Sequence, residues 1–490
     1  MCIKKAGDEV HGVEDKVRAV IAHPTGEFRN EKYRPQFHFT PDRNWMNDPN
    51  GLLYYKGKYH LFFQHNPFAN VWGHMSWGHA VSEDLITWNE LPVAISDDQT
   101  HAIFSGSAVV DYFNTTGFGT LENPPMVAIY TAHKHDDTHQ TQALAFSLDE
   151  GLTWRKYEGN PVIDVQLDHF RDPKVSWDRT TESWLMSVVL PKQRKVSFYT
   201  SNNLKEWRHL SDFGPAGSVE GDWECPDLFP LSVAGDESKT KWILLISINP
   251  GGLTGGSGTQ YFIGDWNGKE FIADDFKTRW LDHGRDNYAG VTFNDAPNSR
   301  RIFIGWMNNW DYAKDFPTDP WRGAMTLPRE LTLISKEGKI ALAANPVSEL
   351  DNYLGEKLSA GAGAELLEIK TSVSTVGGQS TKIRVTSDSG SYFEFGYDAK
   401  SKSLFVDRTN AWNDIPSSHI HSAPISGDDE ILDIKAIVDR SSVEVFTAGG
   451  ASTITDLVVL PGANRGVTFE IAKGCQAPRS LAVRAIAPRR

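Results

Sequence analysis

The chain is poor in cysteine, and its three cysteines, Cys2, Cys225 and Cys475, cannot form a disulfide framework across 490 residues. None of them belongs to a spacing typical of metal ligands. No apolar run approaches the ~18 residues that span a bilayer, so we expect no membrane partner. Positive charge is also scarce, because 49 Lys and Arg stand against 63 Asp and Glu, for a net charge of −14. This balance argues against a nucleic acid partner and suits a neutral substrate.

A secretory leader is missing from the sequence as well. Residues 1–30 are charged and irregular, and the apolar stretch 17–21 is too short and too interrupted to form the core of a leader. We therefore expect either an intracellular protein or a chain from which a leader was removed.

Long segments with helical periodicity are lacking, and short strand-like runs take their place. Such runs recur at 52–55, 59–64, 126–130, 184–189 and 242–246, separated by Gly, Asn, Asp and Pro. The 16 Trp and 14 Tyr fit this pattern, since aromatic rings suit half-buried pleated surfaces. They also fit carbohydrate binding, in which a flat ring stacks on a sugar. The sequence therefore predicts an all-β fold.

A repeated turn divides the first two thirds of the chain. Residues 82–88 (SEDLITW), 147–154 (SLDEGLTW) and 201–207 (SNNLKEW) resemble one another, and their serines are 65 and 54 residues apart. A weaker copy lies at 264–268 (GDWNG). Turns repeated at this period indicate the blades of a β-propeller. The repeating stretch runs from about residue 35 to 335, which at roughly 60 residues per blade predicts five blades.

The pattern changes around residues 336–356, where Trp becomes rare and Ser, Ala and Gly increase. Beyond this point alternating segments at 391–397, 403–407, 431–439 and 442–447 are typical of a β-sandwich. We thus predict a five-bladed β-propeller followed by a C-terminal β-sandwich. The expected boundaries are an N-terminal extension 1–32, the propeller 33–336, a linker 337–356 with a short helix at 346–354, and the sandwich 357–490.

Two acidic residues occupy unusual local sequences in the propeller. Asp48 lies in WMNDPNG at 45–51, where Pro49 favours an extended conformation of Asp48 and a tight turn is expected at Asn50-Gly51. Asp172 follows Arg171, whose charge would favour the ionised carboxylate. Taken alone, the first pattern favours a hairpin turn with a capping Asp, and the second favours a structural ion pair.

A third acidic residue, Glu224, stands between Trp223 and Cys225 in WECPD at 223–227. Apolar surroundings would raise the pKa of its carboxyl group, as a general acid requires, although a buried hydrogen-bonded strand residue fits the same sequence. Three acids distant in the sequence can converge at the axis of a propeller. Glycosidases need two carboxyl groups in opposite protonation states across one bond, so the combination favours a glycosidase.

These three motifs, in this order and at these separations, resemble those of glycoside hydrolase family 32, which includes invertases, exo-inulinases and levanases. The resemblance extends over nearly the whole chain. Further matching stretches are FFQHNP at 62–67, WGHA at 77–80, FSGSA at 104–108, GWMNNW at 305–310 and DRSSVEVF at 439–446. The family implies a five-bladed propeller followed by a β-sandwich, in agreement with the pattern of strands.

The resemblance also implies roles for the three acids. Asp48 would be the nucleophile, Asp172 the stabiliser of the transition state and Glu224 the acid/base. Seven further residues would bind substrate: Asn47, Gln64 and Ser105 to sugar hydroxyls, Trp72, Phe104 and Trp306 as apolar walls, and Arg171 to Asp172 and the sugar. No metal or organic cofactor is expected, since the carboxyl groups would carry out the bond and proton chemistry.

The implied activity is the release of terminal fructose from a fructose-containing oligo- or polysaccharide, with retention of configuration. The wording of residues 171–174, 224–229 and 327–331 resembles levanases and exo-inulinases most, so we expect a fructan exo-hydrolase that also cleaves sucrose. The alternatives are an invertase, a fructosyltransferase and a catalytically silent fructan-binding protein. A monomer or homodimer is expected, and the family is often secreted.

One further segment, HKHDDTH at 133–139, has the composition of a metal site. We expect it instead to form a polar loop of a blade near the mouth of the pocket.

Overall fold

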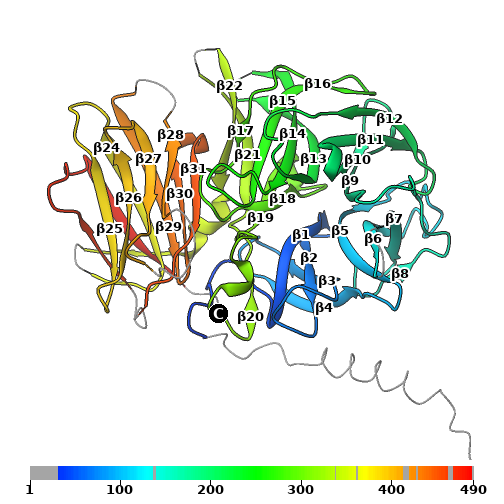
Figure 1. Ribbon diagram of the computed structural model, residues 1–490, viewed down its shortest axis with the longest axis horizontal. Helices are drawn as coiled ribbons and strands as arrows, with labels where there is room; N and C mark the ends of the chain where they lie inside the picture. Colours follow the sequence, from blue (N-terminus) through cyan, green and yellow to red (C-terminus); the bar gives the residue numbers. More distant parts are fainter. Residues whose placement is uncertain are drawn as a thin grey trace, which may run out of the picture.

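The computed structural model describes residues 31–135, 139–234, 236–336, 338–359, 362–411, 419–425, 429–461 and 467–487. The expected N-terminal extension therefore lies outside the described residues, apart from its last two positions. The described chain is built almost wholly from strands, which form a five-bladed propeller and a two-layered sandwich beside it (Figure 1). Within the described residues, no helix is long and apolar enough to cross a membrane.

The propeller consists of five antiparallel sheets in sequence order. The first three blades are β1 (Asn44–Tyr55), β2 (Lys58–Asn66), β3 (Ser76–Ser82) and β4 (Asn89–Ile95); β5 (His101–Val110), β6 (Met126–Lys134), β7 (Gln140–Ser147) and β8 (Arg155–Lys156); and β9 (Arg171–Asp178), β10 (Ser183–Leu190), β11 (Lys195–Ser201) and β12 (Arg208–Phe213). The short strand β20 (Trp321–Arg322) runs parallel to β1 at its free edge.

The fourth and fifth blades join into one nine-stranded sheet through a single pairing of Val233 with Leu333. They comprise β13 (Asp222–Val233), β14 (Asp236–Asn249), β15 (Gly258–Trp266), β16 (Phe271–Ala273) and β17 (Arg279–Trp280), then β18 (Tyr288–Thr292), β19 (Ile302–Trp306), β21 (Arg329–Lys336) and β22 (Lys339–Pro346). The predicted linker 337–356 is corrected here, because β22 pairs along its whole length with β21 and is the outer strand of the fifth blade.

The repeated turn connects the third strand to the fourth in each of the first three blades, and its geometry is shared by the first and third copies. In the second copy, which is one residue longer, Asp149 accepts from the N–H of Thr153. Asp84 accepts hydrogen bonds from the backbone of Ile86 and Thr87, and Asn203 accepts the equivalent bonds two and three residues after it. The indole of each terminal Trp donates to the carbonyl oxygen three residues before it, as Trp88 does to Leu85 at 2.9 Å. The repeat is thus a structural signature of the blades.

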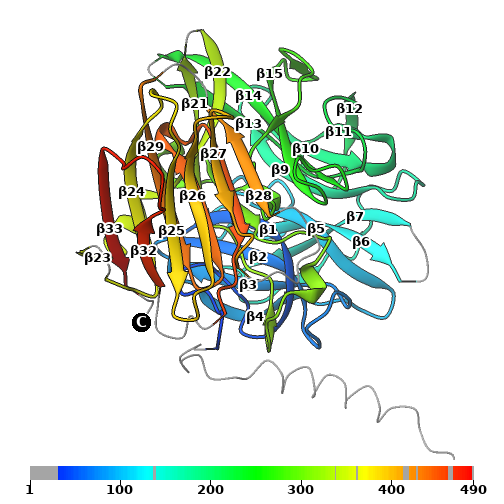
Figure 2. The ribbon, with the colours of Figure 1, turned by 60° about the vertical axis from the view of Figure 1, so that its left-hand side comes forward.

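A short 3₁₀ helix, Ser348–Tyr353, connects the propeller to the sandwich, as the sequence predicts. One sheet of the sandwich has the order β23 (Leu354–Lys357), β33 (Ser480–Ile486), β24 (Leu367–Ser374), β29 (Ile431–Asp439), β30 (Ser442–Thr447) and β31 (Thr453–Leu457). The other has the order β28 (Ile420–Pro424), β27 (Ser403–Asp407), β26 (Tyr392–Asp398), β25 (Thr381–Ser387) and β32 (Val467–Ile471). Figure 2 shows the two layers side by side, and a buried apolar core fills the space between them.

Candidate active site

The five innermost strands of the propeller, one from each blade, form a closed ring. Strands β1, β5, β9, β13 and β18 each contact the next, and β18 contacts β1. Each strand contributes a polar side chain from its first half to one shared site. These side chains are Asp48, Ser105, Asp172, Glu224 and Tyr288. The propeller therefore brings together the three acids that the sequence singles out, although they lie in three different blades.

Asp48 is half-buried at the centre of this site. Its Oδ2 accepts a hydrogen bond of 2.6 Å from the hydroxyl of Ser105, and its Oδ1 accepts one of 3.0 Å from the amide of Asn47. Burial, and secondly the charge of Glu224, raise the pKa of Asp48 to about 6. The hydrogen bonds from Ser105 and Asn47 act in the opposite direction, because they stabilise the carboxylate.

The expected tight turn at Asn50-Gly51 is not present. Both residues lie inside β1, where the pairing with β2 shifts register after Met46 and again after Asn50. Gly51 has a φ of +54°, and a Cβ there would lie 2.5 Å from the ring of Phe62. The glycine therefore permits a bulge within a long strand rather than a reversal of the chain, and the bulge lies just beyond Asp48.

Asp172 has a left-handed backbone, with a φ of +64°, which is uncommon for a residue with a Cβ. Its N–H donates to Thr131 Oγ1, and its Oδ2 accepts a 3.0 Å hydrogen bond from the N–H of Cys225. Burial raises the pKa of Asp172 to about 7, against the effect of Arg171, and the charges of Glu224 and Asp48 add to the rise. Such strain at a buried acid is typical of a functional site.

Cys225 lies between two of the acids. Its Sγ is 3.7 Å from Oδ2 of Asp48 and 3.7 Å from Oδ2 of Asp172. Burial raises the pKa of the thiol well above its ordinary value, and both carboxyl groups add to the effect. Cys225 is therefore a neutral thiol that donates weakly to both carboxylates.

Glu224 is held by charged and polar groups rather than by the apolar surroundings that its sequence suggests. Arg171 donates to Oε1 from Nε at 3.1 Å and from Nη2 at 2.8 Å, and the hydroxyl of Tyr288 donates to Oε2. Arg171 lies 3.9 Å from Asp172, so its closer partner is Glu224, not the neighbour in sequence. The sequence gives no signal for Tyr288, because it lies outside every motif that carries the family resemblance.

Three of the predicted binding residues contact the acids directly, since Asn47 and Ser105 bind Asp48 and Arg171 binds Glu224. Asn47, which contacts Asp48, also accepts a 2.8 Å hydrogen bond from the indole of Trp45. Gln64 donates to the carbonyl oxygen of Ile103, just before Phe104 and Ser105. Trp72 is half exposed and its ring stands at right angles to that of Phe104, with 6.1 Å between their centres.

Trp306 is fully buried against two other indole rings, those of Trp45 and Trp310. Trp310 is partly exposed and contacts both, so it presents the outer ring surface of this cluster. Gly323, with a φ of +96°, passes behind the cluster where a Cβ would lie 2.1 Å from the carbonyl oxygen of Met46. Trp306 thus supports the aromatic wall and Trp310 extends it.

The segment rich in histidine lies at the edge of the same site. The ring of His133 is nearly parallel to that of Phe104, at 4.4 Å between centres, and its Nδ1 lies 3.4 Å from the amide of Gln140. Burial lowers the pKa of His133, and nearby charges, including Arg171, add to the effect. In the described part of the chain no group of His, Cys, Asp and Glu is arranged to hold a metal ion, and residues 136–138 lie outside it.

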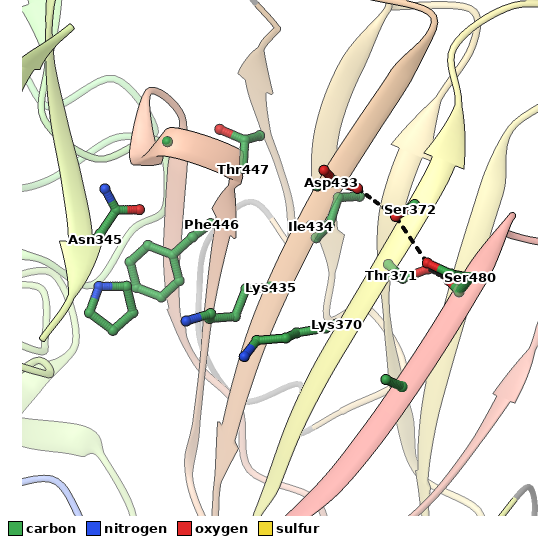
Figure 3. Close-up of a pocket in the computed structure, with 13 residues that line it drawn as sticks. Asn345, Lys370, Thr371, Ser372, Asp433, Ile434, Lys435, Phe446, Thr447 and Ser480 are labelled. Atoms are coloured by element: carbon green, nitrogen blue, oxygen red, sulfur yellow. Dashed lines mark hydrogen bonds between the residues drawn. The ribbon is translucent and has the colours of Figure 1, made fainter. Parts of the chain in front are cut away.

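A separate cavity of about 380 Å³ lies between the propeller and the sandwich (Figure 3). Its walls come from the end of β22 and from strands β24, β29, β30 and β33. Ser480, Ser372 and Asp433 form a hydrogen-bonded row along it, and Lys370 and Lys435 lie beside each other. None of the three acids lines this cavity, so the chemistry of the inner ring takes place elsewhere.

Comparison with known proteins supplies the remaining evidence. The model of the glycosyl hydrolases family 32 N-terminal domain matches residues 38–346, and that of the C-terminal domain matches residues 336–484. The chain is 42% identical to the levanase of Bacillus subtilis over 482 residues, which cover 93% of this chain and 71% of the levanase. It is 38% identical to the extracellular exo-inulinase of Aspergillus ficuum over 480 residues, which cover 87% of this chain and 89% of the inulinase.

Solved structures agree with these relatives. The exo-inulinase of Aspergillus awamori superposes with a TM-score of 0.86 at 35% identity, over 94% of this chain and 99% of that one. The fructofuranosidase of Schwanniomyces occidentalis, solved in complex with fructose, gives 0.84 at 33% identity, over 94% and 100%. The motifs, the fold and these matches together show that the chain belongs to glycoside hydrolase family 32.

Proposed function

We propose that the protein is a retaining, exo-acting β-fructosidase that releases terminal fructose from fructans and sucrose. Family membership makes it a glycoside hydrolase. The observation that supports the finer proposal is the meeting of Asp48, Asp172 and Glu224 from three blades in three different environments. The names of the similar levanase and exo-inulinases support a fructan as substrate.

In the first step Asp48 attacks the anomeric carbon of the terminal fructose. The bond from this carbon to the glycosidic oxygen breaks, and Glu224 gives its proton to that oxygen, so the leaving sugar departs as an alcohol. Asp48 is then bonded covalently to fructose, and Glu224 is a carboxylate. Ser105 and Asn47 stabilise the attacking carboxylate before the step and orient it.

In the second step water attacks the same carbon. Glu224 removes a proton from the water, the bond to Asp48 breaks, and fructose leaves with its original configuration. Both enzyme groups return to their starting states. Arg171 and Tyr288 support this alternation, because each contacts one oxygen of Glu224 and so holds the carboxyl group in one orientation.

Asp172 stabilises the positive charge that develops on the sugar ring and binds its hydroxyl groups. The backbone N–H of Cys225 fixes its Oδ2, and the strained backbone of Asp172 holds the side chain toward the axis. Asn47, Gln64, Ser105 and Arg171 complete the polar contacts to fructose. Trp72, Phe104 and the wall backed by Trp306 enclose the ring.

Phe104, together with the parallel ring of His133, forms a shelf at the edge of the site (the Phe104–His133 shelf). The part of the substrate beyond the terminal fructose extends out of the fructose pocket. The stacked rings of Phe104 and His133 would give that part an apolar contact. We therefore assign this shelf to the sugar that follows the cleaved bond.

An invertase is the nearest alternative, because the same two steps cleave sucrose. A fructosyltransferase differs only in the acceptor of the second step, where a sugar hydroxyl replaces water. A fructan-binding protein without activity fits less well, since Asp48 and Glu224 are both present and buried or half-buried in one site.

Glu224→Ala tests the assignment of the acid. It should lower kcat/KM for sucrose by at least about a hundredfold, because the leaving sugar needs a proton. It should spare kcat/KM for p-nitrophenyl β-fructofuranoside, whose leaving group needs none. An equal loss on both substrates in a folded variant would contradict the acid role.

The products from sucrose, inulin and levan at matched fructose content test the substrate. Free fructose released from the polymers at rates comparable with sucrose supports the fructan exo-hydrolase. Fructose from sucrose alone would make the protein an invertase, and growth of longer oligosaccharides would make it a transferase. Glu224→Ala is the blank in each series.

A further inference from the structure

One edge strand of the sandwich forms backbone hydrogen bonds with the propeller. Strand β31 lies beside propeller residues 281–286, here called the docking segment, which connect β17 to β18; Figure 1 shows β31 on the side of the sandwich that faces the propeller. The backbone N–H of His283 donates to the carbonyl oxygen of Thr453 at 2.8 Å, and that of Asp286 donates to Thr455 at 3.0 Å. The docking segment thus follows the edge of the sandwich like an additional strand.

A glycine in the docking segment permits this close approach. A Cβ on Gly284 would lie 2.2 Å from the carbonyl oxygen and 2.4 Å from the nitrogen of Thr455. Any side chain at this position would therefore push the two backbones apart.

The two acids of the docking segment bind the same strand. Asp282 accepts hydrogen bonds from the N–H of Thr455 at 2.9 Å and from its hydroxyl at 2.6 Å. Asp286 accepts from the N–H of Leu457 at 2.8 Å and from Arg408 Nη1 at 3.0 Å. All these groups are buried, so each hydrogen bond is made without competition from water.

Asp286 is also linked to Glu224 through its neighbours in the sequence. Its other oxygen accepts a hydrogen bond from the hydroxyl of Tyr312. Only Asn287 separates it from Tyr288, the first residue of β18, and Asn287 is itself bound to Asp282 at 3.2 Å. Tyr288 donates its phenolic hydrogen to Oε2 of Glu224. Few free torsions remain between the edge of the sandwich and the carboxyl group of Glu224.

We propose that the sandwich is a working part of the active site: through Asp286 it positions Tyr288, whose hydroxyl orients Glu224 toward the glycosidic oxygen. Asp286 and Arg408 are positioning residues, since neither reaches the substrate site itself. The proposal rests on the assignment of Glu224 as the acid/base. Its physical basis is that protonation requires a fixed oxygen, whereas attack by Asp48 does not involve Tyr288.

The test is Asp286→Asn, assayed as kcat/KM on sucrose and on p-nitrophenyl β-fructofuranoside. We expect kcat/KM to fall about tenfold on sucrose, which corresponds to the free energy of one hydrogen bond, and less than about twofold on the aryl substrate. A merely structural role would reduce both in proportion. An equal loss on both substrates, or no loss, would overturn the proposal.

A double-mutant cycle with Tyr288→Phe examines the route. If Asp286 acts through the hydroxyl of Tyr288, Asp286→Asn adds little once that hydroxyl is gone. Independent, additive losses on sucrose would overturn the proposal. Tyr312→Phe provides a milder variant, because it removes one hydrogen bond to Asp286 and keeps the ring. It should show the same selectivity, and an unselective loss would count against the proposal.

Asp439→Asn is the matched control. Asp439 is a buried acid of the sandwich that binds the imidazole of His38 and the backbone of Gln36 and Phe37, and in the described chain it makes no hydrogen bond to the docking segment. It should lower the temperature of unfolding without changing the ratio of the two substrates, and a changed ratio would overturn the proposal. Glu224→Ala separates the two hypotheses: if it is selective and Asp286→Asn is not, only the positioning by the sandwich fails.

Discussion

Two regions of this molecule hold clusters of buried or half-buried carboxyl groups, and the surroundings of the two clusters differ. At the catalytic end of the propeller, Asp48 and Asp172 lie near each other and near Glu224, and their pKa values are raised to about 6 and about 7, chiefly by burial. At the seam between propeller and sandwich, burial acts in the same direction on Asp439 and Glu444. There His38 and Arg329 reverse the effect and lower both pKa values.

The pKa values of the two sets of carboxyl groups differ because their hydrogen-bond and ion-pair partners differ, not because one set is buried more deeply. His38 lies between Asp439 and Glu444, at 2.8 and 2.7 Å, and Arg329 binds Glu444 and Asp282. At the catalytic end the guanidinium of Arg171 pairs with Glu224 and lies 3.9 Å from Asp172, whereas Asp48 is held by the uncharged side chains of Ser105 and Asn47. The seam holds satisfied ion pairs that stabilise one docking geometry, whereas the candidate active site keeps excess negative charge, which suits the cationic transition state that we propose. Function here opposes stability, and the seam offsets part of that cost.

The largest test of the contrast is Asp48→Asn. The amide cannot attack the anomeric carbon, so kcat should fall at least a thousandfold on sucrose while the fold persists. Steady-state rates and circular dichroism of the purified variant measure the two effects. Substantial residual turnover in a clean preparation would refute the nucleophile.

At the seam, His38→Gln should destabilise strongly in a pH-dependent way. Burial opposes the charged imidazole, but its hydrogen bonds to Asp439 and Glu444 raise the pKa of His38 to about 9. Its contribution, on the order of ~3 kcal/mol, is fully present below about pH 6.5 and is lost as pH rises through about 9. Urea unfolding at pH 6 and pH 10 measures this, and an equal loss at both values would contradict the charged pair.

The same substitution that abolishes activity, Asp48→Asn, should stabilise the protein at neutral pH. Because the folded pKa of Asp48 is raised to about 6, ionising it in the folded state costs stability as pH rises from about 4 through 6. At pH 7.5 the variant should be more stable by about 3 kcal/mol, and near pH 4 it should nearly equal the natural protein. Thermal unfolding of the variant and the natural protein at the two pH values measures this difference. A lower unfolding temperature for the variant at pH 7.5 would contradict the raised pKa of Asp48.

The activity itself should fall in acid. Asp48 attacks only as a carboxylate, so kcat/KM for sucrose should decrease about tenfold per pH unit below a pKa near 6. A profile of kcat/KM against pH between pH 3.5 and 8 measures this acid limb. A plateau that extends to pH 4.5 would show that hydrogen bonds from Ser105 and Asn47 outweigh burial.

The smallest effect concerns the Phe104–His133 shelf. His133→Ala removes one ring of the stacked pair and leaves the three acids intact. It should lower kcat/KM for sucrose, levan and inulin alike by about three- to fivefold, since each substrate places a sugar just after the cleaved bond and loses one apolar contact. His135→Ala, an exposed neighbour, is the control. Unchanged kcat/KM on all three substrates would remove the shelf from the leaving-sugar side.

Much of the architecture could be predicted because it is local. The Ser-x-Asp/Asn-…-Trp turn encodes its own hydrogen bonds, so three copies identified the blades, and the segments 403–407 and 442–447 are strands with the predicted limits. The convergence of Asp48, Asp172 and Glu224 could be predicted because their three motifs together resemble those of a known family, although each motif alone also fits a structural role.

What could not be predicted depends on contacts between blades. The pairing of Arg171 with Glu224 instead of Asp172, and the hydroxyl of Tyr288 on Glu224, arise only when β9, β13 and β18 come together. The bulge at Gly51 and the placement of β22 likewise depend on partner strands, β2 and β21, that no local pattern specifies.

The closed ring of inner strands also determines when the site can form during translation. Asp48, in the first blade, emerges from the ribosome early, and Tyr288, in the last blade, emerges late. The strand that clamps the docking segment, β31, emerges later still. A nascent chain therefore carries Asp48, the nucleophile we propose, for most of translation without a site around it. Asp48 and Glu224 can come together only once the ring has closed.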